Sequence, residues 1–542
     1  MRWYHILPAV VLMATGPAQT GRASALSSQA QGRSGVVVSG NADSAAAGLE
    51  MLRKGGKAAD AAVATILAES VANGDRFCLG GEVAILVYDA GHKAVQALSG
   101  IGAAPLLATL EYFEKAGGIK SGRAQAAAVP GAPDACVTLL QRYGTMTFSE
   151  VVQPALMMLD KGGAKWHRDL ARTLRRLVEA ETGAADRARG LQAVADCFYR
   201  GPIAREIGTW SQAQGGLIRY NDLAGHVTRI EPPVSIEYRG HRVYKCGPWT
   251  QGPALLEALQ ILQGFDLTTM GSQSPDALHV LVEAMKLGFA DRDAYYGDPL
   301  CVDVPLDYLL SDEYTRTRRL LIDMKKASLE LRPGRLPANS IPPAAADTSR
   351  IRDTTTCLAA DRWGNVIAAT PSGWSGVLVG DTGVWLGSRL ISLNTQRGHP
   401  NCIAPGKRPR ITLTPTLVLK AGKPVLAVSV AGGDTQDQAS LQIVTNFIDF
   451  GLDAPRLVNT PRYATEHYIG SFNQRPPILG GLTLDPRVGT DVLESLRQRG
   501  HKVNPVTVTG QERTVIVLDP DTGVMSGAGD PEATPARAAA AF

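Results

Sequence analysis

Three consecutive threonines, Thr354, Thr355 and Thr356, head a strand-like run in the stretch DTTTCLAADRWGNVIAATPS. A threonine hydroxyl is a weak nucleophile unless a base takes its proton, and one such base is the residue's own α-amine. That amine exists only once the preceding peptide bond has been cut, and with a pKa of roughly 8 it acts as a base near neutrality. The pattern therefore marks the bond between Asp353 and Thr354 as a candidate cleavage site. The same residues also suit the start of an ordinary edge strand, because threonine favours strands.

The residues before the threonines have the composition of a connector. Positions 324–353 read MKKASLELRPGRLPANSIPPAAADTSRIRD, which is rich in Pro, Ala and Ser and has no sustained period. Such a stretch predicts a mobile, exposed segment, which is the layout that a cut before Thr354 requires.

A glycine pair offers a second candidate feature. In VSVAGGDTQDQ an apolar run ends at Ala431, Gly432 and Gly433 follow, and a helical pattern begins at once. Backbone N–H groups at a helix N-terminus favour negative charge, and glycines leave them uncovered by side chains. The turn is suited to hold the oxyanion of a reacting carbonyl, although a glycine pair between a strand and a helix is also common without such a role.

The elements around these residues predict an α+β layered fold. EVAILVYD at 82–89 indicates a buried strand, and a helix preceding it ends near Gly55. Ser274 and Pro275 begin a long core helix, whose apolar residues Leu278, Leu281, Met285 and Phe289 are expected on one face. Beyond the connector, TTTCLAA, NVIAAT, TPTLVLK and PVLAVSV are β-rich runs, and the helix after them stops at Gly451. This order does not form a βαβ repeat.

Composition limits the function classes. The 542 residues carry a formal net charge of only +4 and no basic block, which argues against nucleic acid and favours a small-molecule amide or peptide substrate. The seven cysteines lack C-x-x-C spacing and the histidines lack ligand spacing, so we expect neither a metal nor an organic cofactor. Residues 1–25 resemble a signal peptide, or alternatively a disordered extension, and we expect an exported protein without stable membrane insertion.

Taken in order, the motifs of the chain resemble the γ-glutamyltranspeptidase family. Further pieces of the match are GGKAADAAVA, CLGGEVAILVYD, DCFYRGPIAREI, EAMKLGFADRDAYYGDP and GKRPRITLTPTLVLKAGKP. The resemblance implies an N-terminal nucleophile hydrolase with an αββα sandwich, made as a proenzyme that cuts itself into a large subunit, 26–353, and a small subunit, 354–542. It places the nucleophile on Thr354 and the oxyanion-binding glycines on Gly432 and Gly433. Thr355 and Ser372 take the places of supporting hydroxyl residues.

The chain departs from the glutathione-cleaving members at the positions that hold the substrate's head group. The arginine that binds the α-carboxylate falls on Ile101, and the residues that bind the α-amine fall on Arg389 and Ser392. The paired serines fall on Ile411 and Thr412, and the third nucleophile-motif residue, usually histidine, is Thr356. Because an unpaired charge in a closed site costs several kcal/mol, we expect these positions to bind a γ-glutamyl group weakly.

Arg389, with Arg410 nearby in sequence, suggests instead an acyl group that ends in a carboxylate or another acceptor-rich end. The alternative is that either arginine only covers the rim of the site. Ser392, Thr412 and Asp434 complete the candidate substrate contacts. The stretch between Arg389 and Lys407 is shorter than the lid loop of glutathione-cleaving relatives, which favours hydrolysis over transfer.

Three hypotheses follow. The first is an exported, autoprocessed threonine amidase or acylase that works as a heterodimer of its two subunits through an acyl-enzyme. The second is a true γ-glutamyltransferase or glutathione hydrolase whose head-group contacts lie elsewhere. The third, from a different class, is a non-catalytic binding protein that kept the fold.

Overall fold

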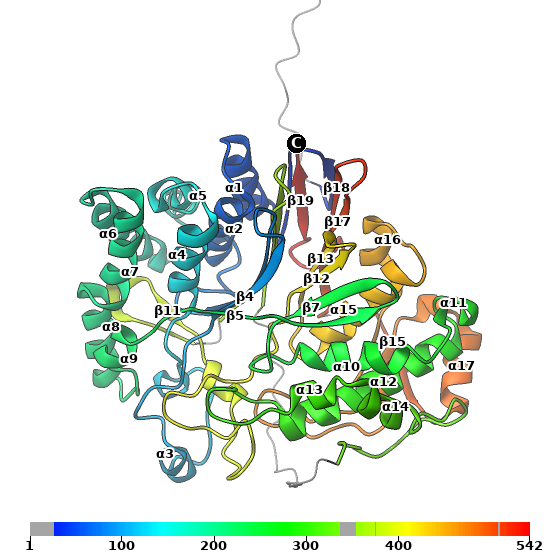
Figure 1. Cartoon of the computed structure of the whole chain (residues 1–542). Coiled ribbons are helices and arrows are strands. Elements are labelled where there is room, and N and C mark those ends of the chain that lie inside the picture. The colour runs from blue at the N-terminus through cyan, green and yellow to red at the C-terminus, as the bar shows by residue number, and fades with distance from the viewer. Residues whose placement is uncertain (1–26, 336–353, 374–375, 508–509) are drawn as a thin grey trace, which may run out of the picture.

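The computed structural model describes residues 27–335, 354–373, 376–507 and 510–542. Two seven-stranded antiparallel sheets lie face to face in it, and helices cover the outer face of each (Figure 1). The expected αββα sandwich is therefore confirmed. The predicted signal peptide, Asp353 and most of the expected connector lie outside the described residues.

Each sheet contains strands from before and after Thr354. The first sheet has the order β19-β2-β8-β9-β3-β4-β5 and the second has the order β1-β18-β17-β13-β12-β7-β6. The strands of the first sheet are β2 (Gly35–Ser39), β3 (Glu82–Asp89), β4 (Ala94–Gly100), β5 (Arg229–Glu231), β8 (Cys357–Asp361), β9 (Val366–Ser372) and β19 (Ala538–Ala541). Those of the second are β1 (Gln29–Gly32), β6 (Val234–Tyr238), β7 (His241–Lys245), β12 (Thr416–Lys420), β13 (Lys423–Ala431), β17 (Glu512–Asp519) and β18 (Val524–Gly529).

Strand periodicity divides the apolar side chains among three layers. Along β3, Ile85 packs into the core beneath the helices, whereas its neighbours Ala84 and Leu86 pack into the core between the sheets. In β13, Val428 faces the second helical layer and Ala427 faces the other sheet. Successive side chains of a strand point to opposite faces, so a strand buried on both sides is apolar throughout.

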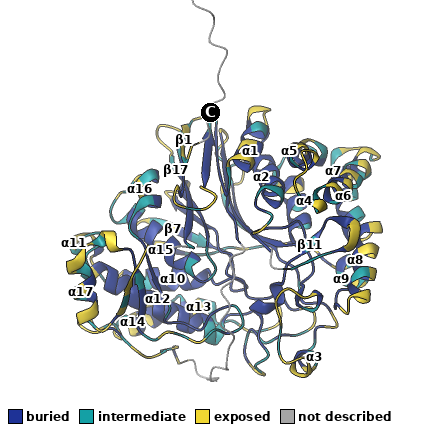
Figure 2. Ribbon diagram, turned by 180° about the vertical axis from the view of Figure 1, so that it is seen from behind, coloured by how far each residue is buried: buried dark blue, intermediate teal, exposed yellow. Residues whose placement is uncertain are grey.

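The helices form two outer layers, and their exposed residues face away from the strands (Figure 2). Over the first sheet lie α1 (Ala42–Arg53), α2 (Ala58–Ala72), α4 (Ala132–Tyr143), α5 (Phe148–Asp160), α6 (Lys165–Thr182), α7 (Arg187–Tyr199), α8 (Pro202–Ala213) and α9 (Tyr220–Ala224). Over the second lie α10 (Pro253–Leu262), α12 (Pro275–Tyr295), α14 (Asp312–Arg319), α15 (Thr435–Ile448), α16 (Ala454–Asn459) and α17 (Thr490–Gln498).

Shorter elements complete the chain. They are α3 (Leu110–Lys115), α11 (Leu267–Met270), α13 (Leu306–Leu309), β10 (Val377–Leu378), β11 (Trp385–Leu386), β14 (Tyr463–Thr465), β15 (Gly481–Leu484) and β16 (Lys502–Pro505), with 3-10 turns η1 (Ala124–Ala126), η2 (Gly380–Thr382), η3 (Arg389–Ser392) and η4 (Pro486–Val488). Among the described residues, no helix combines the length and the apolar character needed to cross a bilayer.

The long helix α12 begins as expected but is buried differently. Ser274 Oγ accepts from the N–H of Ala277 at 3.1 Å, and Pro275 is the first helical residue. The sequence predicted one apolar face, whereas every residue from Ala277 to Arg292 is buried. Neighbouring elements pack around the whole helix, among them α10, α17 and β14, so its polar residues are buried too.

The first part of the expected connector is held against the body of the protein. The N–H of Ala327 donates to the carbonyl of Arg499 at 2.7 Å, and Lys286 Nζ donates to the carbonyl of Ser328 at 2.7 Å. These contacts differ from the mobile segment that the composition predicted, because buried polar side chains of α12 supply partners for its backbone.

Candidate active site

Thr354 lies three residues before β8, at one end of the first sheet. It is 5% exposed and forms an isolated β-bridge with Ser372, the last residue of β9. Thr354 Oγ1 donates to Ser372 Oγ across 3.5 Å, a long hydrogen bond that brings the two predicted hydroxyls together. Since β8 pairs with β2 on one side and β9 on the other, the alternative of an edge strand is wrong.

Thr355 anchors the same segment to the helical layer. Its Oγ1 donates to Glu69 Oε2 at 2.6 Å, and its N–H donates to the carbonyl of Pro371 at 2.9 Å. Glu69, on α2, also accepts from Asn73 at 2.6 Å, while Arg537 donates to Thr355 Oγ1 at 3.4 Å. The hydroxyl of Thr355 thus joins a buried polar network beside the nucleophile candidate.

Arg389 is buried at the floor of the site. Its Nη2 donates to Ser372 Oγ at 2.8 Å and its Nε donates to Glu82 Oε1 at 2.6 Å, while Nη1 donates to Ser392 Oγ at 3.3 Å. With 3% of its surface exposed, Arg389 does not cover a rim, and its charge is already balanced by Glu82. Burial raises the pKa of Glu82, and the neighbouring guanidinium opposes that rise.

The glycine turn that follows β13 presents unpaired backbone donors. The carbonyl of Gly432 accepts from Thr435 Oγ1 at 2.8 Å, and that of Gly433 accepts from the N–H of Gln436 at 3.1 Å. Within the described ranges, the N–H groups of Gly432 and Gly433 have no acceptor. The positive φ angles of 148° and 58° give the turn this orientation, which frees two donors for an incoming oxyanion.

The glycine turn and the threonine pair lie at the same end of the sandwich. Thr370 Oγ1 and Ser429 Oγ are hydrogen-bonded across the two sheets at 2.9 Å. Ser372 and Ala431 each stand two residues further along β9 and β13, which is roughly 7 Å at the rise of a strand. The sandwich thus brings the nucleophile candidate and the free N–H groups to one edge.

Phe472 links the two sides of the site. The guanidinium carbon of Arg389 lies 5.7 Å from the centre of its ring, and a Cβ added to Gly433 would lie 3.3 Å from its Cε2. Neither Phe472 nor Glu82 stood out in the sequence. A signal existed for Glu82, because an acidic residue opens an otherwise apolar strand, but none existed for Phe472.

Asp434 and Arg410 belong to a support behind the glycine turn. Arg292 Nη1 donates to Asp434 Oδ1 at 2.6 Å and to Gln251 Oε1 at 3.0 Å, and Gln251 Nε2 donates to the carbonyl of Gly433 at 3.4 Å. Arg410 donates to the carbonyl of Arg292 at 2.8 Å and is fully buried. Burial, with the nearby charge of Arg292, lowers the pKa of Arg410 to about 10.

The remaining head-group positions are apolar or unpaired. Ile101 packs in the core between the sheets, together with Ile411. The hydroxyl of Thr412 is buried and has no partner in the part of the chain that the structure describes, and the same holds for Thr356. These positions therefore supply no charged contact for a substrate.

One cluster has metal-binding residue types but not the electrostatics of a metal site. His279, Glu283 and His501 offer atoms within 4.8 Å of one another, and the four-residue spacing of His279 and Glu283 along α12 was missed in the sequence, where no ligand spacing was found. Glu283 already accepts from Lys286 and from Arg332, the latter at 2.9 Å, and the two histidines bond to each other at 2.8 Å. These cations occupy the carboxylate that a metal would need.

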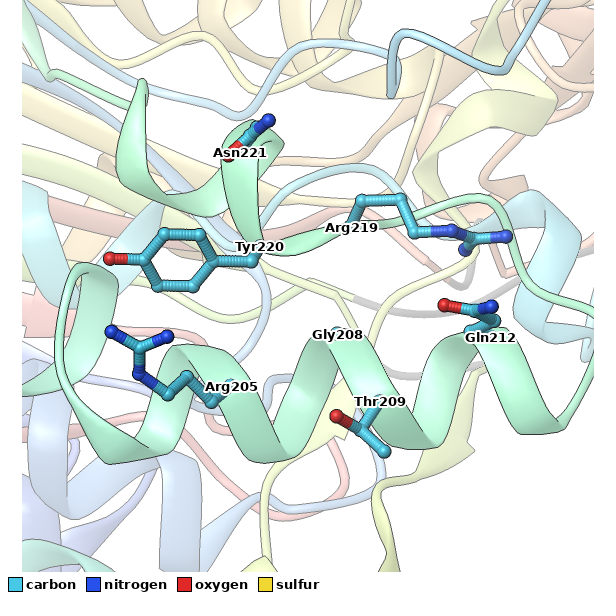
Figure 3. A pocket seen from close by; sticks show the side chains of 7 residues that line it. All are labelled: Arg205, Gly208, Thr209, Gln212, Arg219, Tyr220 and Asn221. Atoms are coloured by element: carbon cyan, nitrogen blue, oxygen red, sulfur yellow. The ribbon is translucent and has the colours of Figure 1, made fainter.

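A groove on the helical layer is separate from the candidate residues. Figure 3 shows it between α8 and the segment entering α9, with Arg205 stacked over Tyr220 at 4.7 Å. Its volume is about 400 Å³, and Thr209, Gln212, Arg219 and Asn221 complete most of its lining.

Comparison with known proteins agrees with this fold and identifies a family. The family model described as Gamma-glutamyltranspeptidase matches residues 44–181 and 161–540. The glutathione hydrolase proenzyme of Escherichia coli (strain K12) is 30% identical over 92% of this chain and 90% of its own length. The acylase ACY 1 proenzyme of Pseudomonas sp. (strain SE83) is 31% identical over 92% of both chains.

A solved structure extends the similarity to the fold. The cephalosporin acylase from Bacillus halodurans superposes with a TM-score of 0.80 at 28% identity, over 98% of this chain and 99% of that one. The family suggested by the motifs is thereby confirmed. The chain belongs to the γ-glutamyltranspeptidase family and is an amide hydrolase of the N-terminal nucleophile type.

Proposed function

We propose that the chain cuts itself between Asp353 and Thr354 and then hydrolyses an amide through an ester on Thr354. The observation that carries this proposal is the placement of the Thr354 hydroxyl beside Ser372, at the end of the sandwich where Gly432 and Gly433 present unpaired N–H groups. The names of the relatives as proenzymes support the cut. The mature protein is then a heterodimer of residues 26–353 and 354–542.

The reaction divides into two halves. Thr354 Oγ1 attacks the amide carbon while its proton passes to the residue's own α-amine, and the carbonyl oxygen becomes an oxyanion held by Gly432 and Gly433. Collapse breaks the C–N bond, and the α-ammonium gives its proton to the leaving amine. Water then attacks the ester in the same way, which releases the acid and restores the hydroxyl of Thr354.

The acyl group that fits this site carries acceptor atoms but no α-ammonium. A γ-glutamyl ammonium would approach the guanidinium of Arg389, and the candidate acidic partner Glu82 is already bound to that guanidinium. The pair therefore offers no free carboxylate to the ammonium, and an unpaired charge in a buried site is costly. Hydrolysis is favoured over transfer by the short stretch between Arg389 and Lys407.

A second candidate is a glutathione hydrolase or γ-glutamyltransferase, favoured by the Escherichia coli relative. Turnover of γ-glutamyl-p-nitroanilide at a rate equal to that of acyl-p-nitroanilides without an α-ammonium would support this candidate and overturn our acyl-group assignment. A binding protein would show no turnover of any of them.

The test of the main proposal is intact mass and N-terminal sequencing of the purified protein. We expect two chains, the smaller beginning at Thr354, and a larger one that begins near residue 26 if export removes a signal peptide. Thr354→Ala is expected to stay one inactive chain, while Thr354→Ser, which keeps a hydroxyl, is still cut. A Thr354→Ala variant that is cut or active would overturn the proposal.

A further inference from the structure

A buried ion pair lies beside Ser372, the residue that contacts the proposed nucleophile. Glu82 is the first residue of β3 and Arg389 opens η3, and both are at least 95% buried. Arg389 contacts Ser372, and Ser372 contacts Thr354, so the pair is one hydroxyl away from the reacting oxygen. The reaction as proposed above assigns no task to either charge.

The chemistry of the guanidinium fixes the direction of these hydrogen bonds. A guanidinium only donates, so Ser372 Oγ must accept from Arg389. Thr354 Oγ1 lies 3.5 Å from Ser372 Oγ, so the position of Ser372 helps to set where the Thr354 hydroxyl lies when its proton passes to the α-amine. Glu82 in turn holds the guanidinium through Nε at 2.6 Å, so the fork cannot rotate away from Ser372.

A purely structural reason for the pair is weak. Replacing a buried ion pair by well-packed apolar side chains is often neutral or stabilising, because desolvation of two charges offsets most of their attraction. Here Glu82 and Arg389 come from segments 307 residues apart, Arg389 donates to Ser372, and Glu82 is the cross-strand neighbour of Ser372 in the pairing of β3 with β9. We infer that Glu82 and Arg389 are positioning residues, which orient Ser372 and through it the hydroxyl of Thr354. This inference rests on the proposed function.

Two other charged groups face the same strand. Glu69, on α2, accepts from Thr355, and Arg537 donates to Thr355. Both groups therefore contact the residue next to Thr354, not Ser372. They remain unchanged in the variants below and therefore cannot produce the differences among them.

A double-mutant cycle tests whether Arg389 acts through Ser372. Arg389→Met and Ser372→Ala are each expected to lower kcat on an acyl-p-nitroanilide by about 10- to 100-fold, because both release the orientation of Thr354. If the effect passes through Ser372, the double variant is no slower than the slower single variant. Multiplied losses in the double variant would overturn the inference.

The pH profile gives a readout that a structural role would not move. Glu82→Gln keeps an oxygen for Arg389 Nε but leaves its positive charge unbalanced near the α-amine of Thr354. A nearby cation disfavours the ammonium form, so the acid limb of kcat/KM is expected to move to lower pH by roughly one unit. An unshifted limb would contradict the inference. Arg389→Lys, which keeps the charge without the fork, should recover little of kcat.

Arg239→Met is the matched control, because it removes another arginine–carboxylate pair. Arg239 Nε lies 2.7 Å from Asp449 Oδ1, in the β6–β7 turn at the opposite end of the second sheet from Gly432. This variant should leave the pH profile unchanged.

Rates are normalised to the amount of small chain. A folded Arg389→Met chain that stays uncut also supports the inference, because the cut uses the same hydroxyl. If that variant does not fold, Glu82→Gln and Arg389→Lys decide. Turnover by Thr354→Ala would overturn the proposed function itself, whereas a multiplicative cycle with inactive Thr354→Ala overturns only this inference.

Discussion

Alanine substitutions at Gly432 and at Gly433 test separately how much space and which backbone conformation the turn after β13 requires at each position. A Cβ on Gly432 would lie 1.7 Å from the carbonyl oxygen of Gly510 and 2.6 Å from Thr435 Oγ1, at a φ of +148°. A Cβ on Gly433 would lie no closer than 3.3 Å to Phe472, and its φ of +58° is in the left-handed region. The first substitution must move backbone, whereas the second needs a ring to shift by a few tenths of an ångström.

The magnitudes follow from this difference. A left-handed alanine costs about 1–2 kcal/mol, which Gly433→Ala incurs with its N–H still in place. Gly432→Ala adds a steric overlap that displaces the turn, and losing an oxyanion donor costs about 2.7–4 kcal/mol of transition-state stabilisation, or about 10²–10³ in kcat. We therefore expect Gly432→Ala to lose at least about 100-fold and Gly433→Ala less than about tenfold.

The assay compares both variants with the parent protein in two reactions. The fraction of chain cut is followed by gel electrophoresis, and kcat on a saturating acyl-p-nitroanilide is normalised to the small chain. Thermal unfolding monitored by near-UV circular dichroism reports whether each variant is folded. Equal losses of kcat in two folded variants, or a larger loss for Gly433→Ala, would refute the reasoning.

Two further predictions concern buried polar groups. Thr355→Val removes a hydrogen bond to Glu69 and should lower the unfolding free energy by about 1.5–3 kcal/mol in denaturant titration, while Thr355→Ser should retain most of it; equal stability of the two would contradict this. Burial, with the nearby Lys286, lowers the pKa of His467 to about 4, so the unfolded chain binds more protons between pH 6.5 and 4 and stability falls through that window as pH drops, by at most about 3 kcal/mol. His467→Gln should flatten this slope; an unchanged slope would assign the acid loss elsewhere.

Local patterns predicted the elements well but not the contacts between them. The apolar run of β3 and the Ser274 cap of α12 follow from the residues themselves, and both occur as expected. The family resemblance placed Thr354 and Ser372 together. The partner of Arg389 could not be predicted, because Glu82 is 307 residues away and only the folded chain brings them into contact.

Burial also depends on neighbours that a local pattern does not contain. The sequence predicted that the connector residues 324–335 are mobile, because they have no periodicity. In the structure, buried polar side chains of α12 such as Lys286 bind their backbone. Asp434 is expected to contact the substrate, and its bond to Arg292, far earlier in the chain, is a contact that the local sequence does not indicate.

The strand order of the two sheets determines how a cut chain would behave. In the first sheet β8 and β9 lie between β2 and β3, and in the second β18, β17, β13 and β12 lie between β1 and β7. The two fragments of a chain cut before Thr354 would thus contribute interleaved strands to both sheets, and each would form part of the other's core. Separating the two fragments would break both sheets, so their association is coupled to folding, and a fragment left alone would expose unpaired strand edges that favour aggregation.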